Sequence, residues 1–196
     1  MGKVVMHNVV SVDGFIADDN DGIGPLFEWY GNGDHAIDGG AKVSKASYDY
    51  VRPVYDALKV TIVGRHVFDL TNGWDGQPPM VEHMVVVSHR PKPEGWHPEA
   101  PYHFVDNVAD AVAKAKELAG DADIAVAAGD VGGQILAAGL VDEVAMDVVP
   151  VVFGSGKRYF GSVDSQHLLE DPDVVIQGDR VLHLRYRVRN ATDGRS

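Results

Sequence analysis

Polar and glycine-rich residues follow four apolar segments of this chain, where they could hold a ligand. We call these residues the strand exits, because each set lies at the end of a segment that we predict to be a strand. They are SVDG at residues 11–14, GRH at 64–66, SHR at 88–90 and AAGDVGG at 127–133. Arginine presents a planar fork that matches phosphate oxygens. A helix that starts in a glycine turn offers free backbone N–H groups to an anion. These residue types favour a site for a phosphorylated ligand.

Asp13 is the carboxylate with the strongest case for chemistry. It follows the apolar segment 4–12, where it would bind a substrate amide or, with a raised pKa, assist proton transfer. The alternative is that Asp13 and Gly14 only form a turn. Three aromatic residues farther along could wall a flat ring or belong to the core: Phe27, Trp29 and Tyr30.

The other exits also have purely structural interpretations. Gly64 would allow a tight turn, and Ser88 would form one. Asp130 stands where a helix N-cap belongs, and its charge would repel a phosphate beside it. Gly132 and Gly133 fall in a first helical turn, where glycine costs stability, so close approach of another backbone or of a ligand would explain them.

Composition narrows the classes of function. The chain has no cysteine, and its nine histidines form no i, i+4 pair beside a carboxylate, so we expect no metal site. No G-x-G-x-x-G or Walker run, which would mark a phosphate-binding loop, occurs either. The net charge of -12 argues against nucleic acid as a partner. No signal-peptide pattern and no membrane-length apolar run are seen, so we expect a cytoplasmic protein with no membrane partner.

Strands and helices must alternate to position these exits. Apolar segments typical of buried strands cover residues 4–12, 60–63, 84–87, 103–105, 124–128 and 144–149. Helical spacing covers residues 44–58, 66–70, 109–119 and 131–138, and Pro53 should kink or divide the first of these. Residues 174–177 and 181–188 flank Gly178-Asp179, a hairpin signal.

This order predicts an α/β fold in one domain. We expect a mostly parallel central sheet with helices on both faces and an antiparallel C-terminal hairpin, over residues 1–190, followed by a polar tail at 191–196. Ligands of such sheets bind at the carboxyl ends of the strands, which is where the four exits lie.

Five runs together resemble the dihydrofolate-reductase-like superfamily: SVDGFIA, VGRHVFD, VVVSHR, the turn at 127–133 and AAGLVDEVAMDVVPVVFGSGKRYF. The nearer branch is similar to the reductase domain of bifunctional riboflavin-biosynthesis deaminase-reductases, over residues 3–188. No deaminase domain or zinc motif is present in the sequence, so the chain resembles a stand-alone reductase domain. The resemblance implies NADPH as cofactor, hydride transfer to a nitrogen heterocycle and a homodimer.

The resemblance also implies roles for single residues. Val9, Ile16 and Ala17 match positions beside the nicotinamide and its covering loop. Asp13 matches the substrate-side aspartate, and Ser11, Trp29 and Tyr30 are the further substrate candidates. The remaining cofactor positions form three groups: Gly64, Arg65 and His66 at the phosphates; Ser88, His89 and Arg90 around the adenosine 2′-phosphate; and Ala128, Gly129, Asp130, Val131 and Gly132 in the pyrophosphate turn.

The pyrophosphate turn departs from the family pattern. Ala127-Ala128 stands where the family has Gly-Gly, whose peptide is cis in dihydrofolate reductases, and a cis Ala-Ala bond would cost about 3 kcal/mol. The departure leaves two alternatives open, a reductase that uses a flavin or deazaflavin and a ligand-binding protein without cofactor chemistry. The family's candidate substrate, 5-amino-6-(5-phosphoribosylamino)uracil, needs cations for its phosphate, and Lys157 and Arg158 are the candidates.

Overall fold

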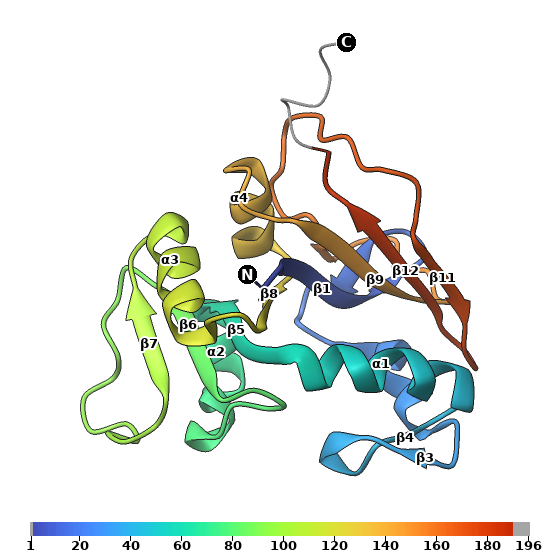
Figure 1. Ribbon diagram of the computed structural model, residues 1–196, viewed down its shortest axis with the longest axis horizontal. Coiled ribbons are helices and arrows are strands. Elements are labelled where there is room, and N and C mark those ends of the chain that lie inside the picture. Colours follow the sequence, from blue (N-terminus) through green and yellow to red (C-terminus); the bar gives the residue numbers. More distant parts are fainter. Residues whose placement is uncertain (1, 190–196) are drawn as a thin grey trace.

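The computed structural model describes residues 2–189, which form a twisted eight-stranded sheet with helices on both faces (Figure 1). The strand order is β11-β12-β9-β1-β8-β5-β6-β7. The central strand β1 (Val4–Ser11) runs parallel to both neighbours, β8 (Asp123–Ala127) and β9 (Glu143–Val149). Valine-rich β1 is buried on both faces, as expected for the middle of a parallel sheet.

The sheet continues differently on its two sides. Beyond β8 lie three further parallel strands, β5 (Leu58–Gly64), β6 (His83–Val87) and β7 (Tyr102–Val105). Beyond β9 lies the C-terminal hairpin, in which β12 (Leu182–Arg187) pairs antiparallel with β9 and with β11 (Val174–Gln177). The predicted fold class is confirmed, including the hairpin.

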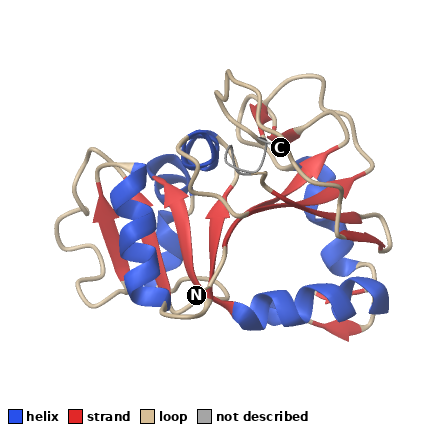
Figure 2. Ribbon diagram, turned by 45° about the horizontal axis from the view of Figure 1, so that its top comes forward, coloured by secondary structure: helices blue, strands red, loops and turns tan. Residues whose placement is uncertain are grey.

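The helices cover the two faces of the sheet (Figure 2). One face packs against α3 (Val108–Ala119) and α4 (Asp130–Ala137), whose apolar residues share a core with Val4, Met6 and Val10 of β1. The other face packs against α1 (Lys45–Ala57) and α2 (Arg65–Leu70). Val9 of β1 points to this second face, because side chains alternate along a strand.

Helix α1 differs from its prediction. Pro53 lies inside a single helix and does not divide it. Proline removes one helical hydrogen bond, but Val51 and Tyr55 on the same helix are buried against the sheet and hold it in place. Ser44 caps the helix by accepting a bond from the N–H of Ser47.

Several short elements were not predicted, because strands of two or three residues and 3-10 helices carry no clear apolar periodicity. The 3-10 helix η1 (Gly24–Gly31) brings Phe27, Trp29 and Tyr30 to the same core as Val9 of β1. Strands β2 (Phe15–Ala17) and β10 (Lys157–Arg158) pair antiparallel beside the end of β1. The remaining short elements are β3 (His35–Ala36), η2 (Asp38–Gly40), β4 (Lys42–Val43) and η3 (Asn72–Gly76).

None of the described helices is both long enough and apolar enough to cross a membrane. The expected tail at residues 191–196 lies outside the described part of the chain.

Candidate functional site

Three neighbouring cavities follow the carboxyl edge of the sheet. The turn cavity, of about 710 Å³, lies between the β5–α2 and β8–α4 turns and the segment 156–163. The cleft, of about 410 Å³, lies between β1, β5, η1 and α2. The distal pocket, of about 440 Å³, lies beside residues 87–90 and 106–108. The turn cavity shares His66, Ala127 and Lys157 with the cleft and Arg65 and Val131 with the distal pocket, so the three form one continuous row.

Gly129 shapes the turn between β8 and α4. Its φ of 105° lies in the region that only glycine adopts readily, and it occupies the N-cap position of α4. Its N–H donates to the carbonyl of Tyr159 at 2.7 Å, which ties the turn to the segment that follows β10. No peptide bond of the described chain is cis, so the Ala127–Ala128 bond is trans here.

Gly132 and Gly133 are required by protein packing. A Cβ atom on Gly133 would lie 2.3 Å from the carbonyl oxygen of Phe160, and one on Gly132 would lie 2.7 Å from that of Ala127. Of the two explanations offered by the sequence, approach of another backbone is therefore confirmed for both glycines. Gly132 does not line the turn cavity, although its neighbours Asp130 and Val131 do.

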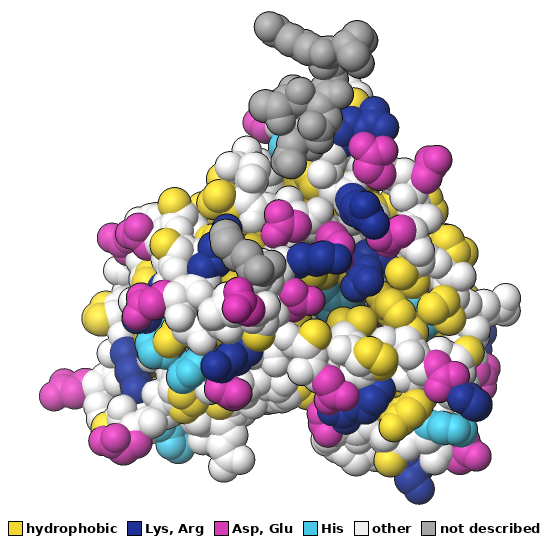
Figure 3. All heavy atoms as spheres, viewed as in Figure 1, with side chains coloured by type: hydrophobic (Ala, Val, Ile, Leu, Met, Phe, Trp, Pro, Cys, Tyr) yellow, Lys and Arg dark blue, Asp and Glu magenta, His cyan; other side chains and the backbone are white. Residues whose placement is uncertain are grey.

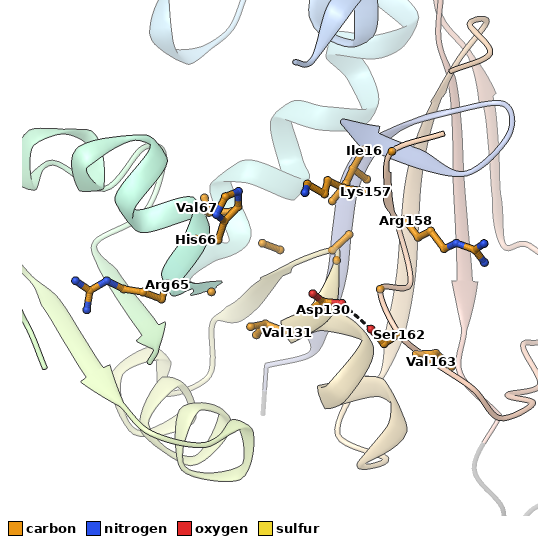
Figure 4. Close-up of a pocket in the computed structure, with 16 residues that line it drawn as sticks. Ile16, Arg65, His66, Val67, Asp130, Val131, Lys157, Arg158, Ser162 and Val163 are labelled. Carbon is orange, nitrogen blue, oxygen red and sulfur yellow. Dashed lines mark hydrogen bonds between the residues drawn. The ribbon is translucent and has the colours of Figure 1, made fainter. Parts of the chain in front are cut away.

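Asp130 is not the N-cap of α4, as the sequence suggested, but the first residue of the helix. Its Oδ1 accepts a hydrogen bond from the Ser162 hydroxyl at 3.1 Å (Figure 4). A carboxylate in the first turn is favourable for the helix dipole. The same carboxylate lies at the wall of the turn cavity, where it would repel a phosphate.

The two arginines predicted to meet phosphates are held by protein groups. Arg65 Nε donates to Asp69 at 2.7 Å, and Arg90 donates to the other oxygen of Asp69 at 2.6 Å. Figure 4 shows the guanidinium of Arg65 directed away from the turn cavity. Its Nη1 donates to the carbonyl of Pro91 at 3.0 Å, so this arginine organises the loop after β6.

Ser88, His89 and Arg90 all line the distal pocket, so the structure brings this group together. Ser88 is also a turn former, because its hydroxyl donates to the carbonyl of Arg90 at 2.6 Å and accepts from the N–H of the same residue at 3.0 Å. His89 and Arg90 are exposed. Asp106 lies in the same pocket and adds negative charge there.

The cleft is mainly apolar. Val9, Ile16 and Ala17 line it, and Phe27 and Tyr30 contribute the aromatic wall that the sequence suggested. Burial raises the pKa of Tyr30 to about 12, and its hydroxyl lies 3.2 Å from that of Tyr55.

Trp29 belongs to the core and does not line the cleft. It is 1% exposed and packs edge-on against His183. Of the two roles open to it, the core role is confirmed.

His66 and Lys157 stand at the junction of the cleft with the turn cavity. His66 Nε2 lies 2.9 Å from Asp21 Oδ1, and Lys157 Nζ lies 3.9 Å from the same oxygen. Asp21 thereby holds the loop at 18–24 over this junction. Figure 4 shows Lys157 extending toward His66, whereas Arg158 extends to the opposite side. Of the two cations nominated for a substrate phosphate, only Lys157 borders the cleft.

Asp13 lies away from the cleft. It borders a further cavity of about 520 Å³, which shares Arg158, Gly161 and Val163 with the turn cavity but no residue with the cleft. Its carboxylate accepts bonds from the Ser11 hydroxyl at 2.6 Å and from the N–H groups of Gly154 at 2.7 Å and Phe153 at 3.1 Å.

The hydrogen bond from Ser11, followed by those from Gly154 and Phe153, lowers the pKa of Asp13. A raised pKa, which proton transfer at Asp13 would need, is therefore not found, and the geometry supports the turn interpretation. Ser11 is 2% exposed and uses its hydroxyl for Asp13 and the N–H of Phe15, which leaves it no access to the cleft.

A polar cluster that the sequence did not single out lies beneath the cleft. His7 Nε2 lies 2.8 Å from Asp147 Oδ2, and His183 Nδ1 lies 2.6 Å from Asp147 Oδ1. These residues come from three adjacent strands, β1, β9 and β12. A signal exists for His7 and Asp147, because each interrupts a strand that is otherwise rich in apolar residues. Strand β12 also contains two arginines, so His183 does not stand out in it.

One family model matches most of the chain. It is the RibD C-terminal domain, and it covers residues 2–183. No curated protein sequence matches the chain.

Solved structures share the fold at low sequence identity. A protein from Shewanella sp. PV-4 whose name assigns it to riboflavin biosynthesis has a TM-score of 0.69 at 20% identity, with 97% of this chain and 100% of that one covered. Dihydrofolate reductase from Enterococcus faecalis, solved with NADP(H), has a TM-score of 0.57 at 14% identity over 96% of this chain and 98% of that one.

A longer relative is the diaminohydroxyphosphoribosylaminopyrimidine deaminase/5-amino-6-(5-phosphoribosylamino)uracil reductase of Thermotoga maritima. It has a TM-score of 0.60 at 15% identity, with 96% of this chain and 57% of that one covered. This chain therefore spans little more than half the length of that two-activity enzyme.

Proposed function

This chain belongs to the RibD C-terminal domain family, and on that premise we propose that it is a reductase that uses NADPH to transfer hydride to a nitrogen heterocycle. Family membership supports the reductase class. The assignment of the cofactor and of the substrate rests on the geometry of the site.

The row of three cavities is the observation that carries the proposal. An extended dinucleotide needs a pocket for its adenosine, a turn of free amides for its diphosphate and an apolar cleft for its reactive ring. The distal pocket, the turn cavity and the cleft follow one another in that order along the sheet edge. Bound NADPH would supply the hydride in the cleft.

The residues of this row can hold such a cofactor. The first N–H groups of α4 have no partner within the helix and lie at the wall of the turn cavity, so they can bind a diphosphate. Lys157 adds a positive charge at the junction with the cleft. Ile16, Val9 and Ala17 present an apolar surface that excludes water from a flat ring.

Calorimetric titration of the purified protein with NADPH and with NADH tests this proposal. We expect micromolar binding of NADPH and weaker binding of NADH, because Arg90 stands in the distal pocket, where a 2′-phosphate would lie. Arg90→Ala should remove the preference, and Arg187→Ala, an exposed arginine on β12, is the matched control.

Failure of both nucleotides to bind would overturn the NADPH assignment. A yellow chromophore that copurifies with the protein would then support the flavin or deazaflavin alternative. Binding of a heterocycle with no redox cofactor would support a ligand-binding protein.

We further propose 5-amino-6-(5-phosphoribosylamino)uracil as the candidate substrate, a cytoplasmic location and a homodimer. The name of the Thermotoga maritima relative supports the substrate, and Lys157 is the cation available for its phosphate. Light scattering at micromolar concentration tests the dimer, and a monomer mass would contradict it.

A further inference from the structure

His7 is an ionisable residue of the cleft that also belongs to the buried polar cluster. Its side chain, from β1, is 30% exposed and lines the cleft together with Tyr30 and Tyr55. It also borders a pocket of about 40 Å³ beneath α1, which has room for little more than one water molecule. A ligand can therefore reach His7 only from the cleft.

The two nitrogens of His7 have different surroundings. Nε2 donates to Asp147 Oδ2 at 2.8 Å. Nδ1 makes no hydrogen bond within residues 2–189 and is not among their buried unpaired atoms, so it stays accessible. An N–H at Nδ1 is thus free to bond to a ligand.

A chain of hydrogen bonds runs from the start of α1 through His183 to Asp147. The Ser44 hydroxyl donates to Ser47 Oγ at 3.3 Å, so the Ser47 hydroxyl can donate to His183 Nε2, 2.9 Å away. His183 then carries its hydrogen on Nδ1 and donates it to Asp147 Oδ1 at 2.6 Å. In this arrangement His183 bonds to Ser47 and to Asp147 through its two ring nitrogens and needs no second proton for either bond.

Asp147 needs a positive charge from His7. Asp147 is 2% exposed, and a carboxylate so deeply buried requires a cationic partner. Arg185 borders the small pocket beneath α1 together with Asp147, but its Nε lies 3.5 Å from Glu143 and 3.9 Å from Asp173.

Two other ionisable groups of the cleft, His66 and Lys157, lie at its junction with the turn cavity and face Asp21, at 2.9 Å and 3.9 Å. The groups packed around His7 itself do not compete with it. Asp123 of β8 accepts from the N–H of Lys3 at 2.8 Å. Burial raises the pKa of Tyr30 and of Tyr50 to about 12, and it raises that of Tyr55 well above its ordinary value, so all three phenols stay neutral at pH 7. Burial alone would lower the pKa of His7, but the charge and hydrogen bond of Asp147 raise it overall.

We propose that His7 is the proton donor of the cleft, with Nδ1–H bonding to and protonating the heteroatom of the C=N or C=O bond that is reduced. This inference rests on the proposed function. Bound NADPH would supply a hydride to the carbon of that bond and would be oxidised to NADP⁺. The heteroatom takes the proton, the π bond is consumed, and His7 is left neutral until it regains a proton from water. Asp147 is the positioning residue that keeps the imidazolium charged and oriented.

Nuclear magnetic resonance of the histidine rings tests the proposal without turnover. The His7 signals are assigned by their loss in His7→Gln, and the probe is 5,6-diaminouracil added to the wild-type protein. We expect the His7 ring to titrate above pH 6.5, the ordinary histidine value, and its Nδ1 signal to shift when the probe is added. A His7 signal that the probe does not move overturns the proposal.

Kinetics with NADPH and 5-amino-6-(5-phosphoribosylamino)uracil give the second readout. Loss of a general acid lowers rates by roughly 100-fold or more, so His7→Gln should lower kcat by that factor with little change in KM. Wild-type kcat should fall as the pH rises through the His7 pKa, and Asp147→Asn should move that fall to lower pH. The matched control His103→Gln removes a part-buried histidine of β7 and should change neither kcat nor the pH at which kcat falls.

The two proposals fail in different ways. If NADPH does not bind but the probe moves the His7 signal, the cofactor assignment is wrong and the role of His7 as donor to the ligand stands. If NADPH binds and His7→Gln keeps full kcat and the wild-type pH profile, the role of His7 is wrong and the cofactor assignment stands.

Discussion

The carboxylate of Asp147 joins three adjacent strands through single hydrogen bonds to His7 and His183. Burial alone would raise its pKa, but the charge of His7 and the hydrogen bonds from His183 and His7 lower it well below 3.8. A carboxylate whose pKa is lower in the folded state stabilises the fold above its unfolded pKa. This contribution is lost as the pH falls below 3.8 toward the folded value.

We predict that Asp147→Asn destabilises the protein at pH 7 and removes part of its acid sensitivity. Removing one partner of a buried ion pair costs about 3–5 kcal/mol, because the other partner is left uncompensated. Urea unfolding at pH 7 and at about pH 3, below the unfolded pKa of 3.8, measures both effects. The difference in unfolding free energy between wild type and variant should be smaller at the lower pH.

Asp49→Asn is the control for this prediction. Asp49 pairs with Lys45 on the exposed side of α1, where an ion pair contributes about 0.5 kcal/mol or less. An Asp147→Asn protein that is as stable as this control would contradict the prediction.

The sequence identified the residues at the strand ends but not those within the strands. Ser88 and Arg90 could be placed because each follows an apolar run, and runs of that kind end at the ligand edge. His7, Asp147 and His183 are far apart in sequence and meet only through the strand order β12-β9-β1. That order depends on long-range pairing, which residue patterns do not specify.

At the scale of elements, α4 depends on a close contact with the segment after β10. Gly133 faces the carbonyl of Phe160 and the side chain of Val163, which approach so closely that a Cβ atom would lie 2.3 Å and 3.0 Å from them. The turn cavity lies between the start of α4 and this segment, so the contact sets the width of the cavity.

We predict that Gly133→Ala destabilises the fold by about 1–3 kcal/mol, the usual cost of overpacking, and weakens NADPH binding. The added methyl must push the 158–163 segment away from α4. Thermal unfolding and calorimetry measure the two effects. Gly31→Ala is the control, because a Cβ atom there meets nothing within 4 Å, and equal behaviour of the two variants would rule out the proposed contact.

The long elements could be predicted because each has a clear period and an end signal. For example, α3 begins after Asn107, which accepts from the N–H of Asp110 at 2.8 Å, and it ends at Gly120 with φ of 62°. The 3-10 helix η1 has no such period, although it supplies Phe27 and Tyr30 to the cleft. The integrity of α1 across Pro53 comes from tertiary packing, which overrides local propensity.

At the scale of the molecule, the charge of the chain opposes its proposed cofactor. The net charge is -12, and on the face shown in Figure 3 the Lys and Arg side chains are interspersed with Asp and Glu. Near the site, Asp69 forms ion pairs with Arg65 and Arg90 and so neutralises part of their charge, and Asp130 lines the turn cavity. A polyanionic dinucleotide therefore approaches against a repulsive field.

We predict that NADPH binds faster and more tightly as salt is raised from about 20 mM to about 150 mM, since the Debye length falls to about 8 Å and screens distant repulsion. NADH carries one phosphate fewer and should respond less, which makes it the internal control. Stopped-flow fluorescence of the reduced nicotinamide measures both association rates. The opposite result, weaker NADPH binding at higher salt, would mean that attraction by nearby cations such as Lys157 outweighs the repulsion of the whole chain. The overall charge would then not govern binding at this site.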